Sequence, residues 1–419
     1  MLFVYSIFAI FAAVYQGFNI METLFKKHDR LLALTSTAII REMMKQVNWE
    51  APMVAIRGPR GVGKSTLLLQ YVKMHYEPYS REVLYCQMDS VYFSSHSLLD
   101  LAEQFYQQGG QRLLLDEVHK YPTWSRELKE IYDLYPDMKV VFSSSSLLNV
   151  LRGDADLSRR CIAYDMQGLS LREFLLFYKG ISIRPRPLEE VLLRPTSLCQ
   201  EVNAQCRPLA CFHEYLQFGY YPFYLRNQTD YYTTIEQVVG YIIDVELPQL
   251  CGIDVANCRK LKALMGILSS SVPYAVDISK LATTIQAHRN TVLGYLNDMG
   301  RAKLLNLLYA DVQSVKKMQK PDKIYVENPN LLYALESGTV DIGTAREAFA
   351  VNQLAYLHQV EYSKKKGDFR IDRKFTVEVG GEGKSFEQLA GVADSFVLAD
   401  NIETPFGRKL PLWLVGFLY

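Results

Sequence analysis

Residues 58–66 read Gly-Pro-Arg-Gly-Val-Gly-Lys-Ser-Thr and contain the pattern G-x-x-x-x-G-K-S. Residues 53–56 (MVAI) before this stretch read as a short buried strand, and residues 66–74 (TLLLQYVKM) after it read as an apolar helix. Glycines let such a loop turn tightly, so that its amide N–H groups point at phosphates. Lys64 would then reach the β and γ phosphates, and the Ser65 hydroxyl would take a position on Mg²⁺.

Strand, loop and helix occur in the order that this chemistry requires, which a chance glycine-rich turn does not explain. The sequence therefore predicts a site for a nucleoside triphosphate and Mg²⁺. The residues expected to bind the nucleotide are Gly58, Pro59, Arg60, Gly61, Val62, Gly63, Lys64, Ser65 and Thr66.

A second apolar run ends in two acidic residues about fifty positions downstream. Residues 112–115 (RLLL) lead directly into Asp116 and Glu117. We expect Asp116 to hold the Mg²⁺ together with Ser65, and Glu117 to be the general base that orients and deprotonates the attacking water. Acids at a strand end can also simply face solvent or cap the next turn. Because the two acids follow a phosphate-binding loop, the metal and base roles are the better interpretation.

A third apolar run, residues 139–142 (KVVF), continues into the four serines 143–146. In ATPases with an additional strand between the two elements above, a polar residue at this strand tip lies near the γ phosphate. We expect Ser143 or Ser145 to be that sensor. A serine-rich turn that caps the following helix is an equally good interpretation.

Two adjacent arginines, Arg159 and Arg160, follow in the segment DLSRR (156–160). Arginines just beyond a nucleotide-binding core can stabilise charge in the transition state, within one chain or across the interface of a homo-oligomer. They are equally consistent with ordinary surface cations.

Length and composition indicate a folded protein of more than one domain. A chain of 419 residues predicts roughly two to four domains. The 49% hydrophobic and 22% charged residues exclude a disordered chain. Because the formal net charge is only +1, a nucleic acid partner would require a local basic patch. Seven cysteines without paired spacing favour a reducing cytoplasm over a disulfide framework.

Residues 1–20 form an apolar extension that matches neither a membrane-spanning helix nor a secretion signal well. The apolar run is shorter than the roughly 20 residues of a spanning helix, and it lacks the positive start of a secretion signal. Our leading interpretation is that Met21 is the true start of a cytoplasmic protein. The alternative is a single anchor that holds the protein at the cytoplasmic face of a membrane.

The pattern of apolar runs divides the rest of the chain. Alternating strand-like and helical stretches predict an α/β three-layer domain with a parallel sheet over residues 21–165. A helical region over residues 166–265 follows. Residues 266–325 show three helical stretches and then a strand-like run, the pattern of a winged helix. Residues 326–419 form a small C-terminal α/β domain.

The predicted winged helix offers candidate contacts to DNA. The third helix would lie in the major groove, and the next strands would carry lysines near the phosphates. A winged helix that only packs against its own protein is the alternative. The candidate residues are His288, Arg289, Asn290 and Thr291 on the helix and Lys316, Lys317, Lys320 and Lys323 after it.

The C-terminal domain carries acids arranged as in metal-dependent nucleases of the restriction-enzyme type. Glu347 is expected on a helix, and Asp368 and Glu378 on strands. In such nucleases two acids bind Mg²⁺, and a lysine two residues after the second helps the water attack. That position is Gly380 here, and the next lysine is Lys384. We therefore expect a nuclease-like domain that has lost cleavage, unless Lys384 substitutes from its own position.

From about Met21 to Tyr419 the chain resembles a large family of prokaryotic AAA-like P-loop ATPases with a C-terminal domain of unknown function and a nuclease-like core. The chain departs from the family at SSSS (143–146), where a glycine is expected second. The segments that carry the resemblance are GPRGVGKST (58–66), LLLDEVHKYPTWSRELK (113–129), DLSRR (156–160), GLSLREF (168–174), FGYYPFYL (218–225) and FTVEVGGEGKSFEQL (375–389).

This resemblance implies ATP binding and ATP hydrolysis, and the preference for adenine over guanine rests on it alone. We therefore expect an ATPase whose ligands are ATP and Mg²⁺. Two kinds of action remain open. The protein could act on DNA through its winged helix, or it could be an ATP-dependent switch whose winged helix and C-terminal domain recognise a protein partner.

Overall fold

The structure is a computed structural model, which describes residues 21–147, 157–270, 274–275, 277–310, 320–336 and 338–419. The predictions made for residues 1–20 lie outside this described part. The chain divides into two compact units, Met1–Met166 and Gln167–Tyr419, each of which is described by itself. No helix within the described ranges is both long and apolar enough to cross a membrane.

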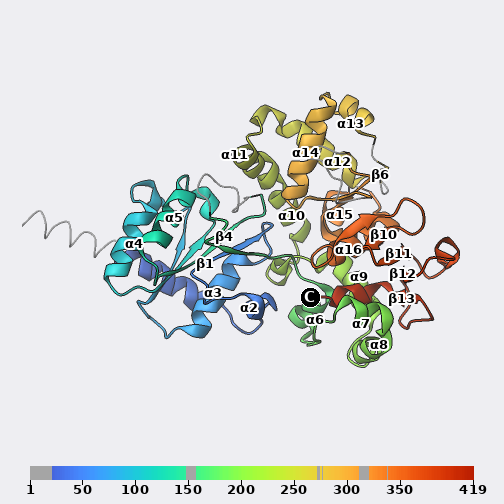
Figure 1. The fold of residues 1–419 in the computed structure, drawn as a ribbon, viewed down its shortest axis with the longest axis horizontal. Coiled ribbons are helices and arrows are strands. Elements are labelled where there is room, and N and C mark those ends of the chain that lie inside the picture. Colours follow the sequence, from blue (N-terminus) through green and yellow to red (C-terminus); the bar gives the residue numbers. More distant parts are fainter. Residues whose placement is uncertain (1–20, 148–156, 271–273, 276, 311–319, 337) are drawn as a thin grey trace, which may run out of the picture. The chain divides into compact units, whose positions relative to one another are not determined.

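Five parallel strands form the central sheet of the first unit, of which Figure 1 labels β1 and β4. The strand order is β2-β3-β4-β1-β5. Their bounds are β1 Met53–Gly58, β2 Val83–Gln87, β3 Arg112–Asp116, β4 Lys139–Ser145 and β5 Ile162–Asp165. The predicted α/β fold with a parallel sheet is confirmed. β4 lies between β1 and β3, so an additional strand does separate the glycine-rich loop from Asp116.

Both faces of this sheet are covered, because alternate residues of each strand point to opposite faces. Met53 and Ala55 of β1 belong to a core with helix 21–34, α4 and α5, whereas Val54 and Ile56 belong to a second core with α2 and α3. The helices are α2 Met43–Gln46, α3 Lys64–His75, α4 Leu98–Gln107 and α5 Trp124–Leu134, with the short turns η1 Val91–Ser94 and η2 Val118–Lys120.

The second unit begins with helices, as predicted. Ser170 starts the first of them with a capping box, in which its hydroxyl accepts from the backbone of Glu173 while the Glu173 side chain bonds back to the Ser170 backbone. The helices are α6 Leu171–Lys179, α7 Leu188–Leu193, α8 Pro195–Asn203, α9 Pro208–Phe218, η4 Pro222–Leu225, α10 Tyr231–Tyr241, the π-helical η5 Ile242–Glu246, α11 Leu247–Cys251 and η6 Val255–Asn257.

Three helices and a small antiparallel sheet follow. The sheet has the order β6-β8-β7, and both of its strand pairs are antiparallel. The elements are α12 Cys258–Ser269, β6 Tyr274–Ala275, α13 Ile278–Thr284, α14 Arg289–Arg301, β7 Leu305–Leu308 and β8 Lys323–Val326.

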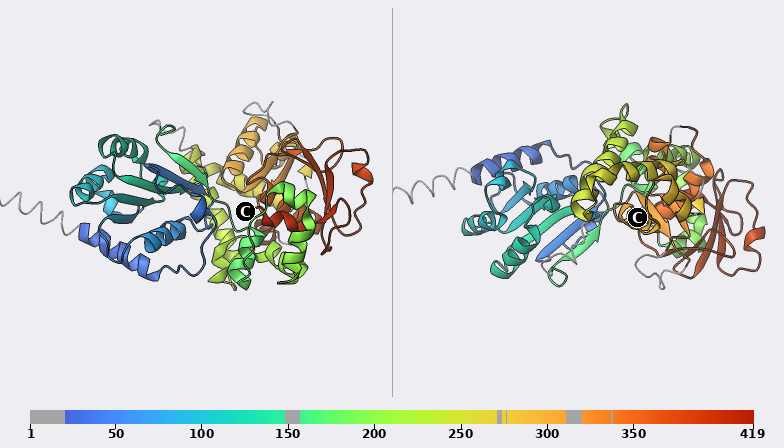
Figure 2. Two further views of the ribbon diagram at one scale, coloured as in Figure 1. Left: turned by 60° about the horizontal axis from the view of Figure 1, so that its bottom comes forward. Right: turned by 90° about the horizontal axis from the view of Figure 1, so that it is seen from above.

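The C-terminal part of the second unit is a mixed five-stranded sheet, which Figure 2 draws in the orange to red end of the colour scale. Its strand order is β13-β12-β11-β10-β9. β9, β10 and β11 pair antiparallel, whereas β11, β12 and β13 pair parallel. The elements are α15 Pro329–Leu335, α16 Ile342–Leu354, β9 Val360–Tyr362, β10 Phe369–Ile371, β11 Phe375–Gly380, η7 Glu387–Leu389, β12 Ser395–Ala399, β13 Lys409–Pro411 and η8 Leu412–Phe417.

One hydrophobic core joins the early helices of the second unit to this sheet. Leu171 of α6, Phe212 of α9, Phe349 of α16 and Trp413 of η8 all belong to it. The helical region and the C-terminal sheet therefore share buried apolar side chains, which ties together segments far apart in the sequence. The finer domain limits drawn from the sequence stay predictions.

Candidate nucleotide-binding site

The glycine-rich loop lies between Gly58, which ends β1, and Lys64, which begins α3. Gly61 and Gly63 have φ angles of 86° and 100°, in the left-handed region that favours glycine. Gly58 meets a different requirement, since a Cβ there would lie 2.2 Å from the carbonyl oxygen of Met166. The loop thus needs two glycines for its turn and one for a close backbone approach.

Lys64 lies over this loop. Its ammonium donates hydrogen bonds of 2.8 Å to the carbonyl oxygens of Gly58 and of Pro59. It also begins helix α3, whose unpaired N–H groups and dipole favour an anion at that end. The Arg41 guanidinium donates a hydrogen bond of 3.1 Å to the carbonyl of Val62, which ties the loop to the segment before β1.

Asp116, the last residue of β3, is almost fully buried and accepts two side-chain hydrogen bonds. Tyr85 of β2 donates to its Oδ2 at 2.7 Å, and Ser143 of β4 donates to its Oδ1. Ser65 lies close enough to the Tyr85 phenol to act on its pKa. The two residues predicted to bind Mg²⁺ are therefore neighbours of one phenol, and their hydroxyl and carboxylate oxygens are of the kind that this ion prefers.

Tyr85 is a residue of the site that the sequence did not single out. Burial, followed by the charge of Asp116, raises the pKa of its phenol far above the usual value, so the group stays a neutral donor. The only signal in the sequence was its place in the apolar run of residues 83–86 (VLYC), which is typical of a buried strand. Such a place does not say which strand will lie beside β3.

Glu117 has an unusual backbone and a charged environment. Its φ is 55°, and its carboxylate forms ion pairs with Lys120 at 2.6 Å and with Arg60 at 3.4 Å. Burial alone would raise the pKa of Glu117, but the hydrogen bond and charge of Lys120, with the charge of Arg60, hold it below its usual value. The side chain is therefore an ionised carboxylate at neutral pH, as a general base requires.

The strand register brings the two candidate serines to this cluster. Ser143 lies opposite Ile56 of β1, and Ser145 lies opposite Gly58. The Ser143 hydroxyl accepts a hydrogen bond of 2.9 Å from the backbone of Glu117, besides its bond to Asp116. The Ser145 backbone N–H donates at 3.3 Å to Nδ1 of His119. These serines belong to β4, although a serine-rich turn was the alternative interpretation.

The two predicted arginines lie apart from these contacts. Arg160 forms a two-fold hydrogen bond with Asp133 of α5, at 3.0 and 3.2 Å, and its guanidinium lies 5.7 Å from the ring centre of Tyr132. Arg159 is exposed. In this arrangement Arg160 is held by its own unit, and the role of both residues in catalysis stays a prediction.

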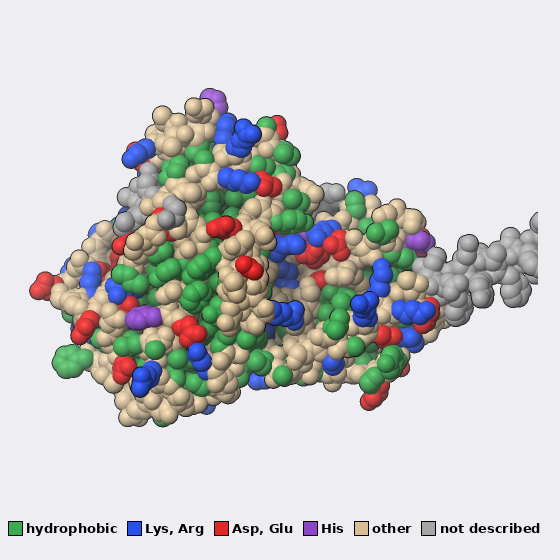
Figure 3. Space-filling model, turned by 180° about the vertical axis from the view of Figure 1, so that it is seen from behind, with side chains coloured by type: hydrophobic (Ala, Val, Ile, Leu, Met, Phe, Trp, Pro, Cys, Tyr) green, Lys and Arg blue, Asp and Glu red, His purple; other side chains and the backbone are tan. Residues whose placement is uncertain are grey.

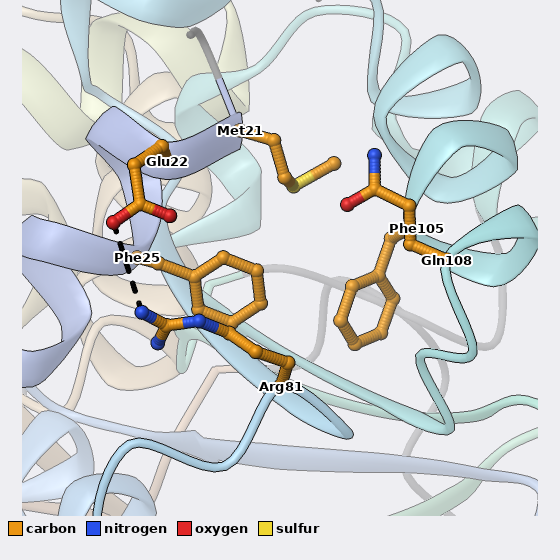
Figure 4. A pocket seen from close by; sticks show the side chains of 6 residues that line it. All are labelled: Met21, Glu22, Phe25, Arg81, Phe105 and Gln108. Carbon is orange, nitrogen blue, oxygen red and sulfur yellow. Dashed lines mark ion pairs between the residues drawn. The ribbon is translucent and has the colours of Figure 1, made fainter. Parts of the chain in front are cut away.

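A cavity of about 430 Å³ lies elsewhere in the first unit (Figure 4). Figure 4 shows Arg81 pointing to Glu22 and lying over the ring of Phe25, with Phe105 farther along the lining. The Arg81 and Glu22 charges are 3.7 Å apart. Met21 and Gln108 complete the lining. No residue predicted to bind nucleotide lines this cavity, so it is separate from the loop site.

Comparison with known proteins agrees with the nucleotide site. Residues 50–175 match the model of a family described as AAA domain. No curated protein matches the chain significantly.

The matches to solved structures are weak. A katanin structure is 14% identical, with 33% of this chain and 49% of that chain covered and a TM-score of 0.24. A RuvB variant from Thermotoga maritima is 15% identical, with 68% and 89% covered and a TM-score of 0.26. The AMPPCP-bound DnaA of Aquifex aeolicus is 17% identical, with 62% and 87% covered and a TM-score of 0.26.

The match spans about half of the katanin chain, and 46% of the C. elegans PCH-2 chain. Likenesses of this size establish neither a shared activity nor a shared partner. Strand order, loop geometry and the family match point to one conclusion for the first unit. Residues 50–175 contain a P-loop AAA domain, which implies ATP binding.

Proposed function

We propose that the protein is a Mg²⁺-dependent ATPase whose reaction takes place at the loop of residues 58–66. Lys64 binds the β and γ phosphates, and Ser65 and Asp116 hold the metal ion. Glu117 orients the attacking water and takes its proton. When bound, Mg²⁺ neutralises charge on the phosphates.

The observation that supports this proposal best is the cluster at the tips of β2, β3 and β4. Asp116 accepts hydrogen bonds from Tyr85 and Ser143, and Ser143 also accepts from the backbone of Glu117. These bonds fix the metal-binding acid and the base relative to each other, which is what positioning of water beside a phosphate requires.

Binding of labelled ATP tests the loop assignment. Lys64→Ala should abolish detectable binding, because the variant loses the ammonium that meets the phosphates. Lys45→Ala, which removes a lysine with 77% of its side chain exposed, is the matched control and should bind normally. Unchanged affinity in Lys64→Ala would contradict the proposed site.

In this proposal Arg159 or Arg160 acts across the interface of a homo-oligomer. Arg160 contacts Asp133, and Arg159 is exposed. Self-association in the presence of ATP, measured by light scattering, would support this role.

We also propose that α12, α13 and α14 with β7 and β8 form a winged helix that contacts DNA. His288, Arg289, Asn290 and Thr291 at the start of α14 are all exposed, as a helix for the major groove requires. Lys and Arg side chains gather on the part of the second unit that α12 to α14 form (Figure 3). The exposed Lys and Arg residues of α12 to α14 are Arg259, Lys262, Lys280, Arg289 and Arg301, of which Lys262 pairs with Asp244 and Arg301 with Asp298.

The lysines after α14 support DNA contact less well. Lys320 is exposed, but Lys316 and Lys317 lie outside the described residues. Lys323 is the least suited of them, because its ammonium pairs with Glu347 at 3.3 Å and lies 4.0 Å from Asp368. Since β8 directs this side chain at the acids of its own unit, we leave Lys323 out of the proposed DNA contact.

The second candidate function is an ATP-dependent switch for a protein partner, and salt dependence separates the two. A protein that contacts several phosphates loses DNA affinity steeply between about 50 and 200 mM salt. Arg289→Ala should reduce the slope of log affinity against log salt by about one, whereas Arg194→Ala, which removes an exposed arginine on the α7–α8 junction, should not. Absence of DNA binding at the lower salt, with or without ATP, would favour the switch.

For the C-terminal sheet we propose a nuclease-like arrangement that does not cleave. The acids are met by lysines of the same unit. Lys323 pairs with Glu347, and Lys384 pairs with Glu378. The Lys384 side chain also lies close to Gly380. A Cβ on that glycine would be only 2.9 Å from Cγ of Lys384. Lys384 thus reaches the place of the missing lysine and forms an ion pair there, which favours a structural network.

A further inference from the structure

His119 is a polar residue of the nucleotide site to which the proposed function gives no role. It lies in η2, two residues after Glu117. Its Nδ1 accepts a hydrogen bond of 3.3 Å from the backbone N–H of Ser145, at the end of β4. A ring nitrogen that accepts from an N–H carries no proton, so the neutral ring carries its proton on Nε2. Ser145 therefore fixes the tautomer of His119.

The donor on the other side of the ring lacks an acceptor. Nε2 of His119 is buried and has no hydrogen-bond partner within the part of the chain that the structure describes. Buried donors in folded proteins almost always have a partner, and an exception calls for an explanation such as a ligand. The Nε2–H group is therefore a candidate contact to a bound molecule.

The surroundings of the ring indicate which molecule this is. Burial lowers the pKa of His119 to about 4, so at neutral pH the ring is an uncharged donor. The groups whose charges act on it are Glu117, Lys64, Lys120 and Arg60. They include both the lysine that is proposed to meet the γ phosphate and the proposed general base. A phosphate oxygen at this place would be an acceptor for Nε2–H.

We propose that His119 senses the γ phosphate of ATP. Its Nε2–H donates a hydrogen bond to a γ-phosphate oxygen. Because its Nδ1 accepts from the Ser145 backbone N–H, binding of that phosphate is coupled to the position of the β4 tip. This inference rests on the proposed ATP site. It also changes the expected role of Ser145, which acts through its backbone N–H, while Ser143 holds the two acids.

The test compares the affinities for ATP and ADP in variants that do not hydrolyse ATP. In a Glu117→Gln background with Mg²⁺, isothermal titration calorimetry gives both dissociation constants. His119→Ala should weaken ATP binding by about tenfold or more and change ADP binding by less than about twofold, because ADP lacks the γ phosphate. His119→Gln should recover part of the loss, since its amide N–H reaches about as far as Nε2.

His75→Ala is the matched control. His75 ends α3, and Lys64 begins it, so the two are about 16 Å apart along the helix. This variant should bind both nucleotides like its parent. ADP binding also reports whether His119→Ala is folded.

Three outcomes would overturn the inference: an equal loss for ATP and ADP, an unchanged ATP affinity in His119→Ala, or a loss of turnover alone when Glu117 is restored. The last result would place the donor on the attacking water. Failure of the parent itself to bind ATP would contradict the proposed ATP site, on which this inference rests. The Lys64→Ala comparison tests that site separately, so the two failures can be told apart.

Discussion

The phenol of Tyr85 donates a hydrogen bond of 2.7 Å to the carboxylate of Asp116. Gln87 lies opposite Asp116 in the pairing of β2 with β3, so the two strand tips end at the same edge of the sheet. The backbone N–H of Tyr85 donates in turn to Nδ1 of the buried His28, at 2.9 Å. One tyrosine thus connects the predicted metal-binding acid to the first helix of the unit.

Tyr85→Phe should destabilise the protein in the absence of nucleotide. It removes a donor from a buried carboxylate, which costs about 1–3 kcal/mol of unfolding free energy. Urea unfolding with and without Mg²⁺ and ATP measures the effect. Tyr79→Phe, which alters a tyrosine with 73% exposure, is the control and should be neutral. Equal stability of the two variants would show that the hydrogen bond to Asp116 contributes nothing.

Glu117→Gln should keep ATP affinity and lose turnover by about a hundredfold or more, since an amide cannot accept the proton of the attacking water. Phosphate release under excess ATP measures turnover. Glu103→Gln on the exposed face of α4 should retain full activity. If Glu117→Gln hydrolyses ATP at the normal rate, another residue is the base.

Acid should destabilise the first unit through His28. Burial lowers the pKa of His28 from 6.5 to about 4. Between these two pH values the unfolded chain takes up a proton that the folded chain does not. The contribution of the neutral ring to stability is therefore complete above pH 6.5 and is lost as the pH falls towards 4. His28 alone should contribute at most about 1.4 kcal/mol per pH unit to the slope of unfolding free energy against pH.

Urea unfolding at a series of pH values measures this slope. His28→Asn should reduce it, because the amide oxygen can accept from the Tyr85 backbone without titrating. His288→Asn, which alters an exposed histidine, should leave the slope as it is. An identical slope in all three proteins would exclude His28 as its source. His119 titrates in the same direction, so part of the slope should remain.

The C-terminal sheet of the second unit should not cleave DNA. Plasmid and linear DNA should stay intact with the full-length protein in Mg²⁺ or Mn²⁺, because Glu347 and Glu378 each have a lysine partner. Agarose gels measure the result. Cleavage that disappears in Asp368→Ala but persists in Lys64→Ala would establish a nuclease and make Lys384 a catalytic candidate.

The architecture of the first unit could be predicted from local sequence patterns. Glycine spacing, an apolar strand before the loop and a helix after it can be read locally, since each depends on neighbouring residues. β1 and α3 form where they were expected, and β3 ends at Asp116. The mixed C-terminal sheet was only partly visible, because its parallel pairs join strands separated by long connections.

Local patterns could not predict which side chains contact one another. Tyr85 and His119 gave no signal of their own in the sequence, because their contacts come from other strands, which strand order and register bring near. Lys323 looked like a free cation until β8 placed it on Glu347. A local sequence pattern predicts whether a residue belongs to a strand or a helix and which face of that element it occupies. The partner of a side chain depends on chain segments that are distant in sequence, and only packing brings those together.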